Sequence, residues 1–160
     1  GFVKNLYGAD GRKISYYQVN AAFFSALAED ERKLLLARAI QIFMPGIPQV
    51  WYLDLFGGTN DYQAATRDGH KEINRTSLSR EELKRRTALP LVQKQLKLLK
   101  FRDTFGAFGH NARLTIDNSE KSLLRLKWEY KEYQATLEAN LASCHFTIHH
   151  GRGAEKHTLM

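Results

Sequence analysis

The segment between Pro45 and Gly58 constrains the fold of this chain more than any other stretch. It is a short apolar run that begins with prolines and ends with a glycine pair. Proline cannot donate to a β-ladder and therefore belongs at the start of a strand, whereas paired glycines are typical of turns. We therefore predict a buried strand over residues 49–55 that closes in a turn at Gly57 and Gly58.

Helical patterns flank this predicted strand. Apolar residues recur every three or four positions over residues 30–43, which predicts a helix that must end before Pro45. Ser79 and Glu82 have the spacing of a capping box, and a helical pattern interrupted near Pro90 follows them. Alternating helices and strands indicate an α/β fold, in which the loop after a strand carries ligand contacts. We therefore expect such contacts within residues 57–77.

The two ends of the chain differ from this middle part. Residues 1–20 are rich in Gly, Asn, Asp and Lys, which predicts a loop with a turn at residues 8–11. Its aromatic residues are expected to pack this loop onto a core, with a pocket wall as the alternative. After a boundary near residues 104–112, short alternating runs predict antiparallel strands over residues 113–117, 122–129, 134–141 and 145–149.

Composition limits the class of protein. With 43% hydrophobic and 26% charged residues, the 160-residue chain is typical of a globular protein. A single cysteine and the absence of a signal peptide or a long apolar run favour a cytoplasmic protein without a membrane partner. The net charge of +7 invites a nucleic-acid partner, but Lys and Arg alternate with Leu and Val at helical spacing. A solvated helix face explains that pattern better.

Spacing supports no self-contained catalytic site. His145, His149 and His150 cluster without a Cys or carboxylate at ligand spacing, so we expect no metal. Neither a phosphate-binding loop nor a dinucleotide fingerprint is present, so we expect no cofactor. Asp54 and Asp61 flank the predicted strand end and could act as paired carboxylates on a sugar. We favour the alternative, in which they cap loops.

Several motifs spread over residues 13–108 resemble, in the same order, one enzyme family. They are Tyr17-Gln18-Val19-Asn20 with Phe23-Phe24-Ser25-Ala26-Leu27, Leu36-Ala37-Arg38-Ala39-Ile40-Gln41, Pro45-Gly46-Ile47-Pro48-Gln49-Val50-Trp51-Tyr52, Asn60-Asp61 and Glu72-Ile73-Asn74-Arg75, with further similarity at Leu91-Val92, Leu98 and Phe101-Arg102. Each motif alone is weak, but five in register are specific. The family is that of the sucrose phosphorylases, in glycoside hydrolase family 13 of the α-amylase superfamily, and the similarity covers their C-terminal part.

The resemblance implies the last strand and helices of a (β/α)8 TIM barrel, followed by a small antiparallel β-sandwich domain. Residues 1–29 would end a loop domain inserted after the seventh strand, residues 30–106 would close the barrel, and residues 107–160 would form the β domain. The implied reaction transfers a glucosyl group from sucrose or another α-glucoside to inorganic phosphate, giving glucose 1-phosphate. The family's three catalytic carboxylates would precede this chain, which alone should be inactive. A homodimer of the full-length protein is compatible with the resemblance.

Three substrate-binding residues follow from the resemblance. Tyr17 and Gln18 match a mobile loop that contacts the acceptor. Lys71 stands where the family has an Arg against the glucosyl group, and it keeps the charge but not the bidentate fork. His70 replaces the preceding Gly, and Arg75 either contributes charge or braces the loop. The acceptor stays open among fructose, glycerate, glycerol and a phosphorylated sugar.

Two further functions stay open at this point. A hydrolase of the same superfamily would release free glucose instead of glucose 1-phosphate. A non-catalytic carbohydrate-binding module would need Trp51, Tyr52 and Trp128 on the surface. The barrel interpretation predicts the opposite for Trp51, which would be buried in the eighth strand.

Overall fold

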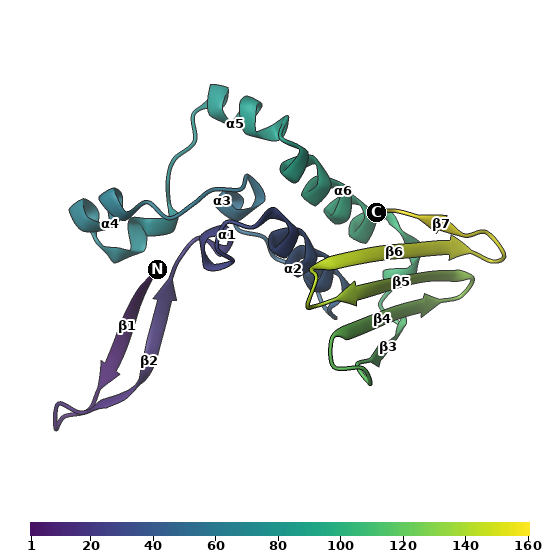
Figure 1. Ribbon diagram of the computed structural model, residues 1–160, viewed down its shortest axis with the longest axis horizontal. Coiled ribbons are helices and arrows are strands. Elements are labelled where there is room, and N and C mark those ends of the chain that lie inside the picture. The colour runs from purple at the N-terminus through teal and green to yellow at the C-terminus, as the bar shows by residue number, and fades with distance from the viewer. The chain divides into compact units, whose positions relative to one another are not determined.

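The computed structural model describes residues 1–160, which form two compact units. The hairpin unit contains residues 1–31 and 50–93, and the sheet unit contains residues 32–49 and 94–160. The bounds of these two units differ from those of the three parts predicted from the sequence. The division into three parts stays a prediction. Figure 1 shows the elements of each unit. No helix of the chain is both long and apolar enough to cross a bilayer.

The hairpin unit starts with a two-stranded antiparallel ribbon and continues with short helices. Its elements are β1 (Phe2–Tyr7), β2 (Lys13–Asn20), α1 (Phe23–Ala26), α3 (Tyr52–Leu55), α4 (Tyr62–Asp68), the 3₁₀ helix η1 (His70–Asn74) and α5 (Arg80–Thr87). The predicted turn at residues 8–11 joins the two strands, where the Gly8 N–H donates to the Arg12 carbonyl. The expected loop over the rest of residues 1–20 is wrong, because β-branched and aromatic residues there pair across the ribbon.

The aromatic residues of this ribbon do not pack onto a core. Tyr16 and Tyr17 are 66% and 64% exposed. Their rings instead lie beside lysines, with the Lys13 ammonium 3.5 Å from the centroid of the Tyr16 ring. Their expected role as packing residues is therefore wrong within this chain.

The expected strand over residues 49–55 is also wrong. The backbone is extended at Trp51 (φ −68°, ψ 138°), and helix α3 then begins at Tyr52. A strand needs a neighbouring strand to pair its backbone groups. In this unit only β1 and β2 pair as strands, so residues 49–55 have no strand partner. Local bonds satisfy the backbone instead, such as that from the Leu55 N–H to the Trp51 carbonyl. The predicted glycine turn does form, with Gly57 at φ +63°.

Helix α5 begins where the sequence predicts. The Ser79 hydroxyl accepts a hydrogen bond from the Glu82 N–H at 3.1 Å, which caps the helix. Arg85 and Arg86 both donate to the Glu82 carboxylate and lower its pKa to about 2. Arg86 also donates to the Phe56 carbonyl at 3.1 Å, so it ties α5 to the turn that follows α3.

The sheet unit combines two helices with one antiparallel sheet. Helices α2 (Glu31–Phe43) and α6 (Pro90–Thr104) belong to it except for their first residues, and the 3₁₀ helix η2 (Gly106–Phe108) follows α6. The strands lie in chain order and are β3 (Arg113–Asp117), β4 (Leu123–Tyr130), β5 (Tyr133–Asn140), β6 (His145–Arg152) and β7 (His157–Thr158). The predicted helix over residues 30–43 and the four predicted strands thus form within a few residues of their expected bounds.

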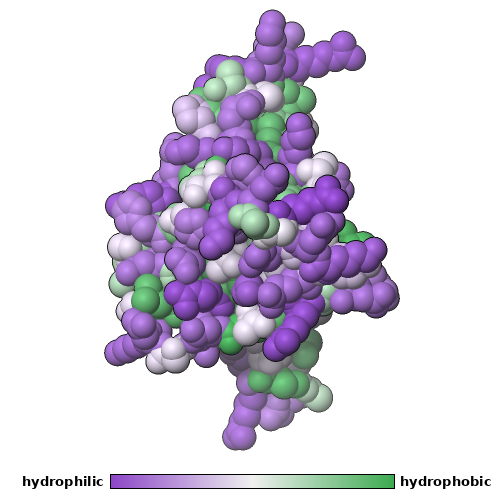
Figure 2. Space-filling model, turned by 90° about the vertical axis from the view of Figure 1, so that its right-hand side faces the viewer, coloured by the Kyte–Doolittle hydropathy of each residue, from purple (hydrophilic) through white to green (hydrophobic).

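The expected β-sandwich is wrong, because the apolar face of the sheet packs on helices instead of a second sheet. Leu126, Leu137 and Ile148 are fully buried in one cluster with helical residues such as Phe43 and Leu98. The buried Trp128 indole donates to the Phe43 carbonyl at 2.8 Å, which ties the sheet to the end of α2. The other face carries exposed charged residues such as Arg125 and Glu138. Hydrophilic residues also cover most of the side of the molecule seen in Figure 2.

His150 makes the stability of the sheet unit depend on pH. Its half-buried ring lies 5.0 Å from the rings of both Phe101 and Phe105, and its Nδ1 is buried without a hydrogen-bond partner. Burial lowers the pKa of His150, and the charges of His157 and Lys97 lower it further. In the unfolded chain the pKa of this histidine is about 6.5. Between that value and the lower folded pKa, the unfolded chain binds a proton that the folded protein does not bind, so stability falls as the pH falls.

Between pH 7.5 and pH 5.5, we expect the free energy of unfolding to decrease less in His150→Phe than in the natural protein. The phenyl ring fills the same aromatic site and cannot be protonated. Urea unfolding at both pH values measures this difference. His110→Gln at an exposed position is the control. An unchanged pH dependence in His150→Phe would contradict the assignment.

Candidate functional site

A network of side-chain-to-backbone hydrogen bonds joins three segments of the hairpin unit where β2 ends. The N–H of the buried Ala22 donates to Asn60 Oδ1 at 2.7 Å, and the Phe23 N–H donates to Asp54 Oδ1 at 2.7 Å. Asn74 Nδ2 donates to the Ala21 carbonyl at 3.1 Å. The residues after β2 are thus bonded both to the loop after α3 and to η1.

The same network is extended by aromatic side chains from the start of α3. The Trp51 indole N–H donates to the Asn74 carbonyl at 2.9 Å, and the Tyr52 hydroxyl donates to the Thr76 carbonyl at 2.9 Å. Trp51 is nevertheless 47% exposed, so its predicted burial is wrong in this chain. Asn20, the last residue of β2, is 5% exposed, and its Nδ2 has no hydrogen-bond partner.

The predicted acceptor-binding residues lie at a break in the ribbon register. Gln18 pairs with Lys4, whereas Asn5 pairs with Tyr16, so Tyr17 is one extra residue on β2. This arrangement is a β-bulge, and bulges frequently lie next to active sites because they re-aim a side chain. Gln18 is half-buried and Tyr17 is exposed. Neither residue carries a feature in the sequence that would have predicted the bulge.

Lys71 lies on η1, which contacts β2. The structure therefore brings together the two elements that carry the predicted residues. Lys71 is exposed, and its neighbour His70 has a buried Nε2 without a hydrogen-bond partner. Arg75 pairs with Glu72 at 3.5 Å, which agrees with a bracing role for this arginine.

The two aspartates considered as paired carboxylates hold backbone groups instead. Asp61 caps helix α4 by accepting from the Ala64 N–H at 2.8 Å, while Asp54 accepts from the Phe23 N–H. Their capping role is thus confirmed. The loop that contains Asp61 borders a hollow of about 400 Å³, while the ligand contacts expected within residues 57–77 stay a prediction. Its lining consists of Leu53, Gly58, Thr59, Asn60, Asp61, Tyr62, Gln63, Thr76 and Arg86.

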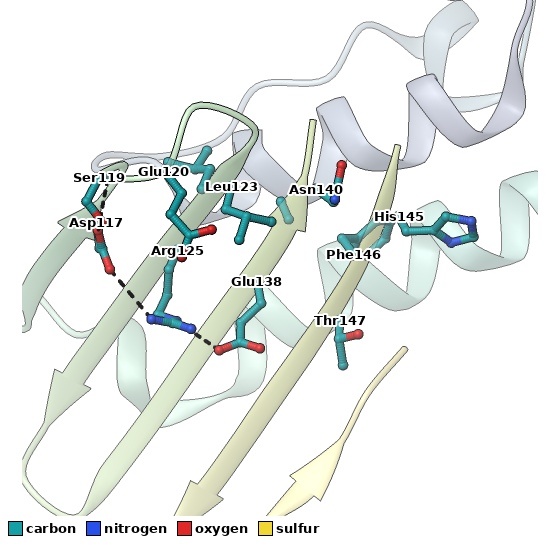
Figure 3. Close-up of a pocket in the computed structure, with 12 residues that line it drawn as sticks. Asp117, Ser119, Glu120, Leu123, Arg125, Glu138, Asn140, His145, Phe146 and Thr147 are labelled. Carbon is teal, nitrogen blue, oxygen red and sulfur yellow. Dashed lines mark hydrogen bonds and ion pairs between the residues drawn. The ribbon is translucent and has the colours of Figure 1, made fainter. Parts of the chain in front are cut away.

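A second hollow, of about 280 Å³, lies on the solvated face of the sheet and is shown in Figure 3. Arg125 lies between two carboxylates there, 3.5 Å from Asp117 and 2.8 Å from Glu138. The guanidinium is thus already compensated, and the hollow offers no spare cation for an anionic ligand. The network at the end of β2 is the better candidate site.

Asn60 gives a direct test of this network. We expect Asn60→Ala to lower the free energy of unfolding by about 1–3 kcal/mol, because the buried Ala22 N–H loses its acceptor. Asn60→Asp keeps an oxygen in the same place and is the matched control. Urea denaturation of both variants measures the difference, and an alanine variant as stable as the aspartate variant would contradict the role of Asn60.

Comparison with known proteins identifies relatives of this chain, although no family model matches it. A sucrose 6(F)-phosphate phosphorylase of Ilumatobacter coccineus is 53% identical over 153 residues, which cover 94% of this chain and 29% of that protein. A second, from Thermoanaerobacterium thermosaccharolyticum, is 38% identical over 82% of this chain and 27% of its own length. A sucrose phosphorylase of Streptococcus mutans is 32% identical over 88% of this chain and 30% of its own length.

A solved structure agrees with these relatives. The crystal structure of sucrose 6F-phosphate phosphorylase from Thermoanaerobacter thermosaccharolyticum superposes with a TM-score of 0.90 at 32% identity, covering 98% of this chain and 32% of that one. The chain therefore spans somewhat less than a third of the length of the proteins that it matches. On this evidence, the chain belongs to the family of the sucrose phosphorylases and related glucoside phosphorylases, of which it represents one portion.

Proposed function

We propose that this chain is the C-terminal part of a retaining enzyme that transfers a glucosyl group from a phosphorylated sucrose to inorganic phosphate. The observation that carries this proposal is the 53% identity with a sucrose 6(F)-phosphate phosphorylase over 94% of the chain. The relatives named for other substrates are less similar, at 36% for a glucosylglycerol phosphorylase and 32% for a sucrose phosphorylase. A phosphorylated sucrose is therefore the preferred substrate among those left open by the sequence.

In the proposed reaction, a carboxylate of the full-length enzyme attacks C1 of the glucosyl group while a carboxylic acid protonates the departing oxygen. A phosphate oxygen then attacks C1 and displaces the carboxylate, which gives glucose 1-phosphate with retained configuration. These carboxylates are proposed to lie outside the present chain. This chain would supply binding groups to the site, namely Tyr17 and Gln18 toward the acceptor and Lys71 toward the glucosyl group.

A positive charge is needed at such a site because phosphate must approach carboxylates of the same sign. Lys71 is exposed on an element that contacts β2. We propose that its ammonium reaches a ligand bound near Gln18. The proposal includes the end of a TIM barrel, in which the residues just before α3 pair with neighbouring strands. The extended backbone at Trp51 is compatible with that pairing. A cytoplasmic location and a homodimer are further parts of the proposal.

The exposed Trp51 raises the possibility of a carbohydrate-binding module, but other observations weigh against it. Trp51 and Tyr52 are tilted by 51° to each other, and both polar ends bond to backbone carbonyls, so they form no flat stacking platform. Trp128, which such a module would also need, is only 7% exposed. We therefore retain the phosphorylase.

The reaction can be tested on the full-length protein. With sucrose 6F-phosphate and saturating inorganic phosphate, we expect glucose 1-phosphate, measured through phosphoglucomutase and glucose 6-phosphate dehydrogenase. Free glucose as the sole sugar product from the glucosyl half would identify a hydrolase and overturn the proposal.

Lys71 can be tested in the same assay. We expect Lys71→Met to lower kcat/KM about tenfold or more, because a charge-assisted hydrogen bond contributes roughly 1.5–3 kcal/mol. Lys71→Arg should retain activity, since it keeps the charge and can form a bidentate contact. Lys84→Met, at an exposed position of α5, is the control. Equal kcat/KM for Lys71→Met and the natural enzyme would exclude the contact.

A further inference from the structure

The β-bulge of the ribbon places a lysine beside the predicted acceptor-binding residues. Lys4 of β1 is the registered partner of Gln18 of β2. Its Nζ lies 5.5 Å from the centroid of the Tyr17 ring, which is the extra residue of the bulge. One cation of β1 is thus next to both residues that are proposed to contact the acceptor.

The charges of the ribbon leave this lysine available. Arg12 pairs with Asp10 at 3.8 Å, so the acidic residue of the turn is already compensated. Lys13 lies over the Tyr16 ring near the turn, at the far end of the ribbon from Gln18 in register. Lys4 forms no ion pair with a carboxylate in the structure.

We propose that Lys4 recognises the phosphate group of the phosphorylated acceptor and so contributes to substrate specificity. This inference rests on the proposed function, because it takes Tyr17 and Gln18 as acceptor contacts. A lysine ammonium is a compact point charge that binds phosphate through any of its three N–H donors. The bulge turns the β2 backbone at this position, so Gln18 can bond the sugar hydroxyls while Lys4 meets the phosphate.

Two other sources of the effect have to be separated. Inorganic phosphate carries the same chemistry as the phosphate ester of the sugar, so a contact with the second substrate would also depend on Lys4. A merely structural lysine would stabilise the ribbon through the Tyr17 ring and would not discriminate between substrates. Lys13 makes a closer contact with its own tyrosine ring, at 3.5 Å, and is therefore a matched control for that structural effect.

The experiment measures kcat/KM of the full-length enzyme for sucrose 6F-phosphate and for sucrose, together with KM for inorganic phosphate. The specificity ratio is kcat/KM for sucrose 6F-phosphate divided by kcat/KM for sucrose. In Lys4→Gln, we expect this ratio to fall about tenfold, because one charge-assisted contact is lost. Lys4→Arg should restore most of the ratio, and Lys13→Gln should leave it unchanged.

An unchanged ratio in Lys4→Gln, an equal fall of the ratio in Lys13→Gln, or a change only in KM for inorganic phosphate would each overturn the role of Lys4. These outcomes leave the proposed function intact as long as the natural enzyme forms glucose 1-phosphate. Absence of glucose 1-phosphate from both sugars in the natural enzyme would instead overturn the proposed function and, with it, this inference.

Discussion

The backbone after β2 has polar groups that no strand or helix satisfies, and the candidate site depends on how they are paired. A buried N–H or carbonyl needs a hydrogen-bond partner. Here the side chains of Asp54, Asn60 and Asn74 supply the partners for residues 21–23. These side chains come from two other segments of the hairpin unit, so the register of three segments is fixed by three polar contacts. Tyr17 and Lys71 lie within a few residues of them.

Features governed by local rules could be predicted from the sequence. The helix over residues 31–43 follows from apolar periodicity and ends before Pro45. Ser79 caps α5 because its hydroxyl lies three residues before the Glu82 N–H. The strands of the sheet follow from alternation and turn residues, since their neighbours are adjacent in the chain. In each case the residues that decide the structure are within a few positions of each other.

Features that need a distant partner could not be predicted in the same way. Residues 49–55 have strand composition, but a strand forms only beside another strand. The ribbon over residues 2–20 has loop composition and pairs nevertheless. A sheet with one apolar face packs equally well on a second sheet or on helices, and the sequence pattern of the strands does not distinguish these partners. The bulge at Tyr17 depends on pairing register, which no single-strand pattern reveals.

The central claim is that this chain forms one wall of a glucosyl-transfer site, and a crystal structure of the full-length protein with sucrose 6F-phosphate tests it most directly. The account predicts that residues 49–51, just before α3, pair with neighbouring strands and that the side chains of Tyr17, Gln18 and Lys71 lie within about 3.5 Å of the bound sugar. Residues 49–51 without a strand partner, together with those three side chains facing solvent away from the sugar, would contradict it.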